Sequence, residues 1–491
     1  MSSENNYYHL LGIERDATAE EIRQAYRDAV RRLHPDAHPN DPEAPERFLQ
    51  VQKAYEILND PNKRTEYDKS LPKEPEIIRV NALYSRSYLP PLNEPQLLYV
   101  KLDFEAPEDA REIPPPTLNI ALVLDRSTSM QGPRLDMVKT TAIELTRQLK
   151  PQDVLSIIAF SDRAEVLLQA GTQIDQSRVE NAIRLLQAGG GTEIYQGLKA
   201  GYSEIQRYYQ PRYVNHIILI TDGRTYGDEE NCLRLTDQAR KQGIGISGLG
   251  IGHEWNDSFI DQITSRTGGN TVYVARPKHI QDFLSQKFSQ LGQIYAENVA
   301  LEIEANPQAK LLSAFRLQPE VGPIELNGGH LLLGNIPKKA PLSVLLEFRV
   351  EAISASNGRI SIARGQTQFS IPGINLQSHK RRLHLHREIS TKNEPDLPQP
   401  EIMQALSKLT LYHLQEKAQR DVKAGKFQEA TQRLQNLATH LLAQGETELA
   451  QTVMIEARNI YHTHALSAEG GKQIKYGTRS LLLPAHSGSG A

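Results

Sequence analysis

Hydrophobic residues in the N-terminal part of the chain recur at the spacing of α-helices. Residues 18–33 and 43–58 each place apolar side chains at the helical repeat, so that these side chains share one face of a helix. Pro35 ends the first helix because proline lacks the backbone N–H that a continuing helix needs. We therefore predict a helical domain over residues 5–70.

The pattern changes over residues 118–294, where short apolar runs alternate with amphipathic segments. The runs at 118–124 and 214–221 are continuous, as expected for strands that are buried on both faces. The segments at 135–149 and 193–208 show the helical repeat instead. This alternation predicts a doubly wound, Rossmann-like α/β domain with a mostly parallel sheet.

Apolar and polar residues alternate on both sides of the α/β domain, which is typical of half-buried antiparallel strands. This alternation covers residues 77–105 and 298–375. The first segment is too short to bury a core of its own. We therefore predict that both segments form one β-sandwich and that the α/β domain is inserted in it.

The C-terminal part of the chain returns to helical spacing. Residues 398–464 contain long amphipathic segments separated by glycine-containing turns, so we predict a helical hairpin region there. Residues 466–491 are rich in glycine and serine, which predicts a flexible tail. The expected fold class is a multidomain α/β protein with helical domains at both ends.

Charge and composition narrow the classes of function. The chain has 491 residues and a formal net charge of −3, and this balance argues against a dedicated binder of nucleic acid or of anionic membranes. Cys232 is the single cysteine, which excludes an internal disulfide and fits a reducing compartment. The N-terminus lacks a secretory signal, and no apolar run is as long as a membrane helix. We therefore expect a cytoplasmic protein without nucleic-acid or membrane partners.

A His-Pro-Asp tripeptide lies between the two long helices predicted at the N-terminus. Its proline fixes the backbone, so the carboxylate of the aspartate is presented in a turn and not within a helix. The helix before it carries arginines at i, i+4 and i+8, which form one basic stripe suited to an acidic groove on a partner. The tripeptide is His34, Pro35 and Asp36, and the stripe is Arg23, Arg27 and Arg31.

Residues 5–70 resemble the J-domain of DnaJ-type co-chaperones. Besides the tripeptide, the resemblance rests on Tyr8-x-x-Leu11-Gly12-Ile13 and on Lys63-Arg64-x-x-Tyr67-Asp68. It implies that the tripeptide contacts a DnaK-type heat-shock ATPase and promotes ATP hydrolysis, with the arginine stripe as the dock. The Gly/Phe-rich linker and the zinc region of larger DnaJ proteins are missing, so we expect any client to bind elsewhere on the chain.

Oxygen-bearing side chains gather in three loops of the predicted α/β domain. Asp125-x-Ser127-x-Ser129 follows one strand, Thr192 lies in a glycine-rich loop, and Asp222 follows another strand. Because ligands bind at the carboxyl ends of strands in such sheets, we expect these side chains to converge. They are hard oxygen donors of the kind that Mg²⁺ takes. The neutral hydroxyls leave the cation partly unneutralised, so it attracts a further carboxylate.

This arrangement resembles the metal-ion-dependent adhesion site of von Willebrand factor type A domains, and the resemblance covers residues 118–294. It implies that three hydroxyl residues bind the metal directly, that two aspartates hold metal-bound water, and that an acidic side chain of a protein partner completes the coordination. Mg²⁺ is the expected ion, with Mn²⁺ and Ca²⁺ as alternatives. The direct ligands are Ser127, Ser129 and Thr192, and the aspartates are Asp125 and Asp222.

Two functions are compatible with this combination. One is a co-chaperone adaptor that stimulates a DnaK-type ATPase and binds a protein partner through the metal. The other is a subunit of a protein assembly, for example with a MoxR-type ATPase, whose J-domain recruits a chaperone for assembly or disassembly. We expect no enzymatic activity, because Ser127 lacks a Gly-x-Ser-x-Gly setting and no histidine follows the required pattern.

Overall fold

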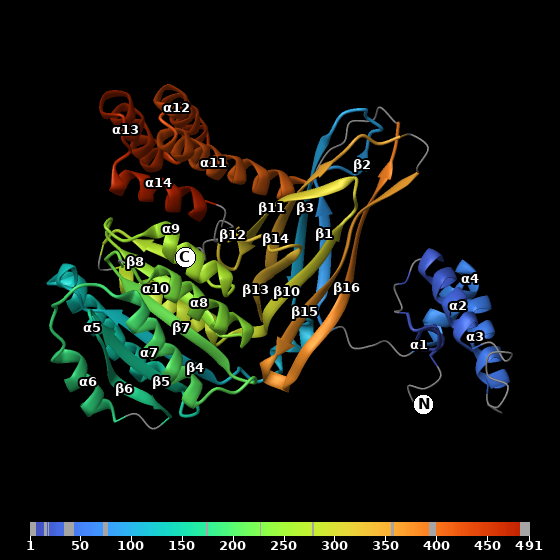
Figure 1. Ribbon diagram of the computed structural model, residues 1–491, viewed down its shortest axis with the longest axis horizontal. Coiled ribbons are helices and arrows are strands. Elements are labelled where there is room, and N and C mark those ends of the chain that lie inside the picture. The colour runs from blue at the N-terminus through green and yellow to red at the C-terminus, as the bar shows by residue number, and fades with distance from the viewer. Residues whose placement is uncertain are drawn as a thin grey trace, which may run out of the picture. The chain divides into compact units, whose positions relative to one another are not determined.

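The computed structural model divides into two compact units, Met1–Glu76 and Ile77–Ala491 (Figure 1). In their described residues, the first unit has one hydrophobic core and the second contains several. The structure describes residues 6–13, 17, 19–33, 44–71, 77–172, 175–225, 227–276, 279–354, 358–391 and 399–481.

The N-terminal unit is a small helical domain, as the spacing of its apolar residues predicts. Its core joins Ile22 of the second helix to Val51 of the third. Tyr26 and Tyr55 stack on each other across the same two helices, with ring centroids 4.1 Å apart. The helices are α1 (Tyr7–Leu11), α2 (Ala19–Leu33), α3 (Ala44–Leu58) and α4 (Pro61–Ser70).

A six-stranded sheet forms the centre of the α/β domain in the second unit. Neighbouring strands run parallel except at one edge, where the last strand is antiparallel. The sequence does not reveal this edge strand, because Ala170 is its single buried residue and no apolar face repeats along it. In spatial order the strands are β6 (Ala164–Gly171), β5 (Val154–Phe160), β4 (Leu118–Asp125), β7 (Val214–Thr221), β8 (Gly245–Ile251) and β9 (Thr271–Val274).

Helices cover both faces of this sheet. Successive residues of β4 enter different cores: Ile120 and Leu122 pack on one face, and Ala121 and Val123 pack on the other. The prediction of a doubly wound α/β domain is therefore confirmed. One face carries α5 (Pro133–Gln148), α6 (Gln176–Arg184) and α10 (His279–Leu291), and the other carries α7 (Ile194–Arg207), α8 (Glu229–Lys241) and α9 (Asp257–Arg266).

Two packed sheets form a β-sandwich around a shared core. Strand pairs are antiparallel apart from one short parallel pair at an edge. The first sheet has the order β1 (Arg79–Tyr84), β3 (Gln96–Glu105), β14 (Leu342–Val350), β11 (Ala309–Gln318), β12 (Gly322–Ile324). The second has the order β13 (His330–Pro337), β10 (Ile294–Ala305), β15 (Arg359–Ile371), β16 (Leu376–Ile389), β2 (Tyr88–Leu89).

The sandwich combines strands from before and after the α/β domain. β3 pairs with β14 so that Val100 lies opposite Leu346, although the α/β domain separates the two strands in sequence. The predicted insertion of the α/β domain in a β-sandwich is confirmed by this pairing.

Two boundaries of the sequence interpretation are wrong. The sandwich does not end at residue 375, because β16 pairs with β15 along most of its length. The charged run Lys380–Arg382 interrupts the alternation of apolar and polar residues in β16, so the sequence pattern does not indicate a strand there. Residues 466–491 are not all a flexible tail, because Ala468–Ser480 form the helix α14. Residues 482–491 lie outside the described residues.

The C-terminal helices pack on both the β-sandwich and the α/β domain of the second unit. Ile402 and Tyr412 pack against Phe315 and Leu345 on the outer face of the first sandwich sheet.

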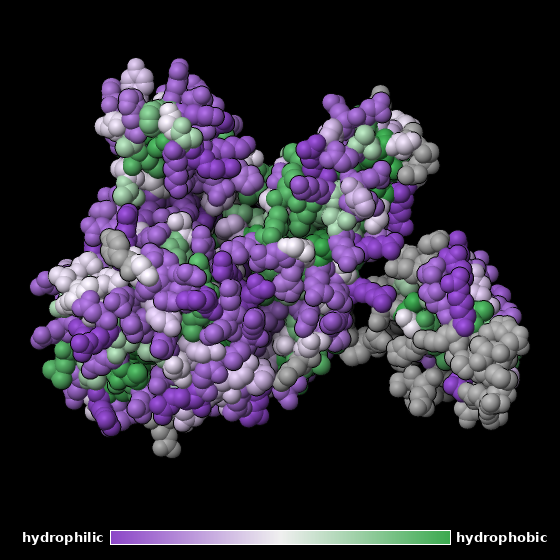
Figure 2. All heavy atoms as spheres, in the orientation of Figure 1, coloured by the Kyte–Doolittle hydropathy of each residue, from purple (hydrophilic) through white to green (hydrophobic). Residues whose placement is uncertain are grey.

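Figure 2 shows a mainly hydrophilic face, with hydrophobic side chains gathered over the upper part of the sandwich. In the described part of the chain, no helix combines the length and apolar character that crossing a bilayer requires. The remaining helices are α11 (Pro400–Lys423), α12 (Phe427–Ala443) and α13 (Thr447–Thr463), and short 3-10 helices lie at Glu108–Arg111, Thr128–Met130 and Pro372–Ile374.

Candidate functional site

The loops that the sequence singles out lie at the carboxyl edge of the central sheet. β4 and β7 are hydrogen-bonded neighbours, with Leu124 opposite Ile220. Asp125 therefore ends one strand where Asp222 follows the other. Thr192 precedes α7, whose residues pack on the same part of the sheet. The parallel topology thus brings three distant parts of the sequence to one edge.

Asp125 is the buried centre of this cluster. Its carboxylate accepts a hydrogen bond from the backbone N–H of Ser127 at 2.8 Å and another from Thr221 Oγ1 at 2.6 Å. Burial raises the pKa of the Asp125 carboxyl to about 6, although the hydrogen bonds from Ser127 and Thr221 act in the opposite direction. These bonds hold the Asp-x-Ser turn against the end of β7.

The hydroxyls form a chain that leads to the second carboxylate. Ser127 Oγ lies 3.1 Å from Ser129 Oγ, and Ser129 Oγ donates to Asp222 Oδ1 at 2.7 Å. A side chain at Gly223 would approach Thr192 Oγ1 to 2.7 Å, so the glycine leaves room for the threonine beside Asp222. All five residues of the sequence-based site are therefore brought together.

The cluster opens to solvent on one side. Asp125, Asp222 and Ser127 are buried, whereas Thr192 is half-buried and Ser129 is exposed. The carboxylates and hydroxyls supply hard oxygen donors. Among the described residues no group of three or more His, Cys, Asp or Glu side chains is placed to hold a metal ion; this cluster offers two carboxylates and three hydroxyls instead.

Two neighbours of the cluster escape sequence reasoning. Arg134, at the start of α5, forms an ion pair with Asp222 and donates to the carbonyl of Ser129 at 3.3 Å. Asp162 accepts from the N–H of Gly191 at 2.7 Å and so fixes the loop that carries Thr192. Neither residue belongs to a sequence motif. Only the folded structure shows that they lie at the site.

The residues of the proposed chaperone contact are described in part. His34, Pro35 and Asp36 lie outside the described residues. Arg23, Arg27 and Arg31 are exposed on α2, and their contact with an ATPase stays a prediction. The domain beneath them is tied together by Tyr8, which donates to Asp68 at 2.8 Å and accepts from Arg64 at 2.9 Å.

Family models match three parts of the chain. Residues 6–68 match the DnaJ domain, and residues 119–286 match the von Willebrand factor type A domain. Residues 400–484 match the Sll0103-like, C-terminal alpha-helical domain.

Individual proteins are similar to different parts of the chain. The uncharacterized protein sll0103 of Synechocystis sp. is 28% identical over 398 residues, which cover 79% of this chain and 93% of that protein. The chaperone protein DnaJ of Halothermothrix orenii is 48% identical over 68 residues, which cover 14% of this chain and 18% of that chaperone. The chain thus spans less than a fifth of the length of the DnaJ chaperone that it matches.

Solved structures share the fold at low sequence identity. A von Willebrand factor type A protein from Catenulispora acidiphila superposes with a TM-score of 0.63 at 14% identity, over 82% of this chain and 96% of that one. The ArnB paralog VWA2 from Sulfolobus acidocaldarius gives a TM-score of 0.51 at 12% identity, over 83% and 100%. The chain therefore joins a DnaJ domain and a von Willebrand factor type A domain to a C-terminal helical domain of the Sll0103-like kind.

Proposed function

We propose that this chain is a non-enzymatic co-chaperone adaptor. Its DnaJ domain stimulates a DnaK-type ATPase, and its type A domain binds a protein partner through a divalent cation. One observation carries the proposal: a chain with a DnaJ domain also presents, at an exposed sheet edge, a cluster of oxygen donors. The cluster consists of Asp125, Ser127, Ser129, Thr192 and Asp222.

The donor chemistry of the cluster fits a hard divalent cation such as Mg²⁺. Ser127, Ser129 and Thr192 would bind the ion directly, and Asp125 and Asp222 would hold its water molecules and orient the hydroxyls. Once bound, the ion supplies a concentrated positive charge to which an acidic side chain of the partner binds. Asp125 already orients Ser127 through the backbone hydrogen bond at 2.8 Å.

The charge balance of the cluster supports an acidic ligand. Asp125 and Asp222 in their ionised forms, together with the guanidinium of Arg134, leave one net negative charge. A divalent cation changes this to one net positive charge. Because Ser129 is exposed, that charge faces solvent at the point where a partner would approach.

The chaperone side of the proposal rests on the DnaJ domain. The match covers the His34-Pro35-Asp36 tripeptide and the helix with the exposed arginines. Because the matched DnaJ chaperone shares only 18% of its length with this chain, client handling would fall to the type A domain and the domains around it.

ATP turnover by a purified DnaK-type ATPase tests the chaperone side. We expect the full chain to accelerate turnover and Asp36→Asn to abolish the acceleration, because the substitution removes the carboxylate of the His-Pro-Asp tripeptide. Asp28→Asn removes an exposed carboxylate from the same domain and should leave the acceleration unchanged. Equal acceleration by wild type and Asp36→Asn would contradict the proposal.

Metal-dependent capture tests the partner side. We expect immobilised wild-type chain to retain a partner in Mg²⁺ and to release it in EDTA, and Ser127→Ala/Ser129→Ala to retain none. Ser177→Ala/Ser203→Ala removes two hydroxyls from exposed positions of the same domain and serves as the matched control. Calorimetric titration with Mg²⁺ alone separates loss of the metal from loss of the partner.

The same experiment distinguishes the adaptor from an assembly subunit. An adaptor that delivers clients should also bind unfolded model proteins. If unfolded proteins do not bind, while one folded partner is retained in Mg²⁺ and released in EDTA, the chain acts as a subunit of an assembly, for example with a MoxR-type ATPase.

A further inference from the structure

A groove of about 520 Å³ lies between the type A domain and the C-terminal helices. One wall comes from the type A domain, with Arg224 and the loop that begins at His253. The other wall comes from the end of α11, with Lys423, and from the start of α14, with Lys472. We call this feature the basic groove, because most of its charged side chains are cationic.

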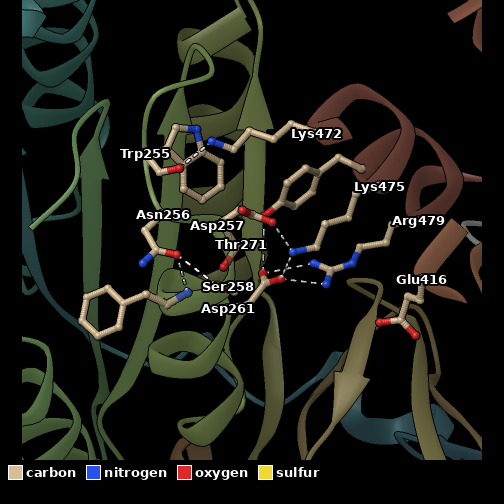
Figure 3. Close-up of polar contacts among 12 residues, drawn as sticks. Trp255, Asn256, Asp257, Ser258, Asp261, Thr271, Glu416, Lys472, Lys475 and Arg479 are labelled. Carbon is tan, nitrogen blue, oxygen red and sulfur yellow. Dashed lines mark hydrogen bonds and ion pairs between the residues drawn. The ribbon is translucent and has the colours of Figure 1, made fainter. Parts of the chain in front are cut away.

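The second wall of the basic groove is fixed by a buried ionic contact. Asp261 on α9 pairs with Lys475 at 2.8 Å and with Arg479 at 2.8 Å, and Lys475 also pairs with Asp257. Figure 3 shows these side chains of α14 reaching the type A domain. Each partner of Asp261 is almost fully buried, so α14 is held as a firm wall.

Lys472 brings a buried cation to the floor of the groove. Its ammonium donates to the carbonyls of His253, at 2.7 Å, and Trp255, and it lies 4.7 Å from the centre of the Trp255 ring. Burial lowers the pKa of this ammonium to about 8. Its charged neighbours are Asp257, Arg224, Lys475 and Glu254.

The charges along the groove do not balance. Asp257 is engaged by Lys475, and Glu254 is exposed beside the groove. Within the described parts of the chain, no ion pair with an acidic side chain is found for Arg224, Lys423 or Lys472. An anionic ligand would therefore meet more cationic than acidic side chains along the groove.

Arg224 links the basic groove to the oxygen cluster of the type A domain. Arg224 follows Asp222 by two positions, and its Nε donates to the carbonyl of Glu254 at 2.8 Å. On the other side, Arg134 pairs with Asp222, and its guanidinium would lie 3.0 Å from a Cβ at Gly252. A chain bound at the cluster would thus have a cationic path into the groove.

We infer that the basic groove binds an acidic peptide segment of the same protein partner whose carboxylate reaches the cation of the type A domain. This inference rests on the proposed metal-dependent function and adds the chemistry of the partner. The partner presents one acidic residue to the ion and further acidic residues to Arg224, Lys423 and Lys472. Charge complementarity of this kind sets specificity and association rate.

Binding of a fluorescein-labelled hexaglutamate peptide to the full chain tests the inference by fluorescence anisotropy. In Mg²⁺ we expect Arg224→Glu/Lys423→Glu to weaken binding by about tenfold or more, because two attractive charges become repulsive. Arg178→Glu/Lys310→Glu makes the same change of net charge at exposed positions elsewhere and should shift the affinity by less than about twofold. Circular dichroism confirms that both variants are folded.

The outcomes separate this inference from the proposed function. Equal affinity of wild type and Arg224→Glu/Lys423→Glu would overturn the inference that the basic groove binds the peptide. If EDTA still releases the peptide in that case, the metal-dependent function stands. Loss of affinity in this variant supports the groove. If that loss occurs while EDTA and Ser127→Ala/Ser129→Ala have no effect, the groove binds acidic peptides without the metal, and both the metal-dependent function and the proposed link between groove and cation fail.

Discussion

Replacing Asp261 should loosen α14 from the type A domain. Asp261 holds both Lys475 and Arg479 of α14. Despite its burial, these two cations lower the pKa of the Asp261 carboxyl from 3.8 to about 2. A difference of that size corresponds to about 2 kcal/mol of stabilisation of the ionised form. Asp261→Asn also leaves the buried Arg479 without its acidic partner and Lys475 with Asp257 alone, so the total loss should reach about 3 kcal/mol.

Trp255 reports on this contact directly. It is the single tryptophan of the chain, it is fully buried, and α14 covers it with Lys472 and Tyr476. When α14 leaves, tryptophan emission should shift to longer wavelength. In a urea titration we expect the shift in Asp261→Asn to occur at a clearly lower urea concentration than in wild type.

A matched substitution and a pH series complete the test. Asp257→Asn removes one of the two partners of Lys475 and leaves Arg479 paired, so its loss should stay below about 1 kcal/mol. Because the folded pKa of Asp261 is depressed, its contribution is fully present above pH 3.8 and is lost as the pH falls through about 2. The wild type and Asp261→Asn should therefore converge toward pH 2. Equal urea midpoints at pH 7, or a difference that persists at pH 2, would refute this reasoning.

Three further perturbations have defined outcomes. Gly250→Ala places a methyl group into the ring of Trp255, and we expect the free energy of unfolding to fall by about 3 kcal/mol or more. The thermal midpoint measured by tryptophan emission should be lower, and an unchanged midpoint would contradict the packing. The Cys232 thiol is buried and its pKa is raised by that burial, so it should react with a thiol reagent only after unfolding; rapid reaction of the native protein would contradict the fold. Arg134→Gln removes the cation that competes for Asp222, so calorimetry should show Mg²⁺ binding about fivefold tighter, at roughly 1 kcal/mol for one near charge; weaker binding would mean that Arg134 supports the cluster.

The sequence predicts much of the cluster but not its surroundings. Asp125 and Asp222 were predictable, because continuous apolar runs identify the strands that they follow and parallel strands end at one edge. Arg134 and Asp162 carry no sequence signal, since their contacts depend on where α5 and the loop after β5 lie in the folded domain.

Tertiary contacts also explain why the amino-acid composition does not predict the helix α14. α14 contains Gly470 and Gly471, which are poor helix formers. A Cβ at Gly470 would overlap the carboxylate of Glu456, so the glycine permits close packing. Ser467 caps the helix by accepting from the N–H of Gly470 at 2.9 Å. The stability of α14 comes from such tertiary contacts and from the ionic contact with Asp261, which local propensity does not reveal.

The pairing of β3 with β14 also has a consequence for how the polypeptide is made. Hydrogen-bonded partners in these strands, such as Asp103 and Ser343, are 240 positions apart. At the usual pace of translation, β3 emerges from the ribosome on the order of tens of seconds before its partner exists. During that time one edge of β3 lacks its hydrogen-bonding partner strand. The apolar side chains of β3, with Leu98, Val100 and Phe104, also lack the complete sandwich core in which they will be buried. A nascent chain of this design has an exposed, aggregation-prone strand until β14 has been synthesised.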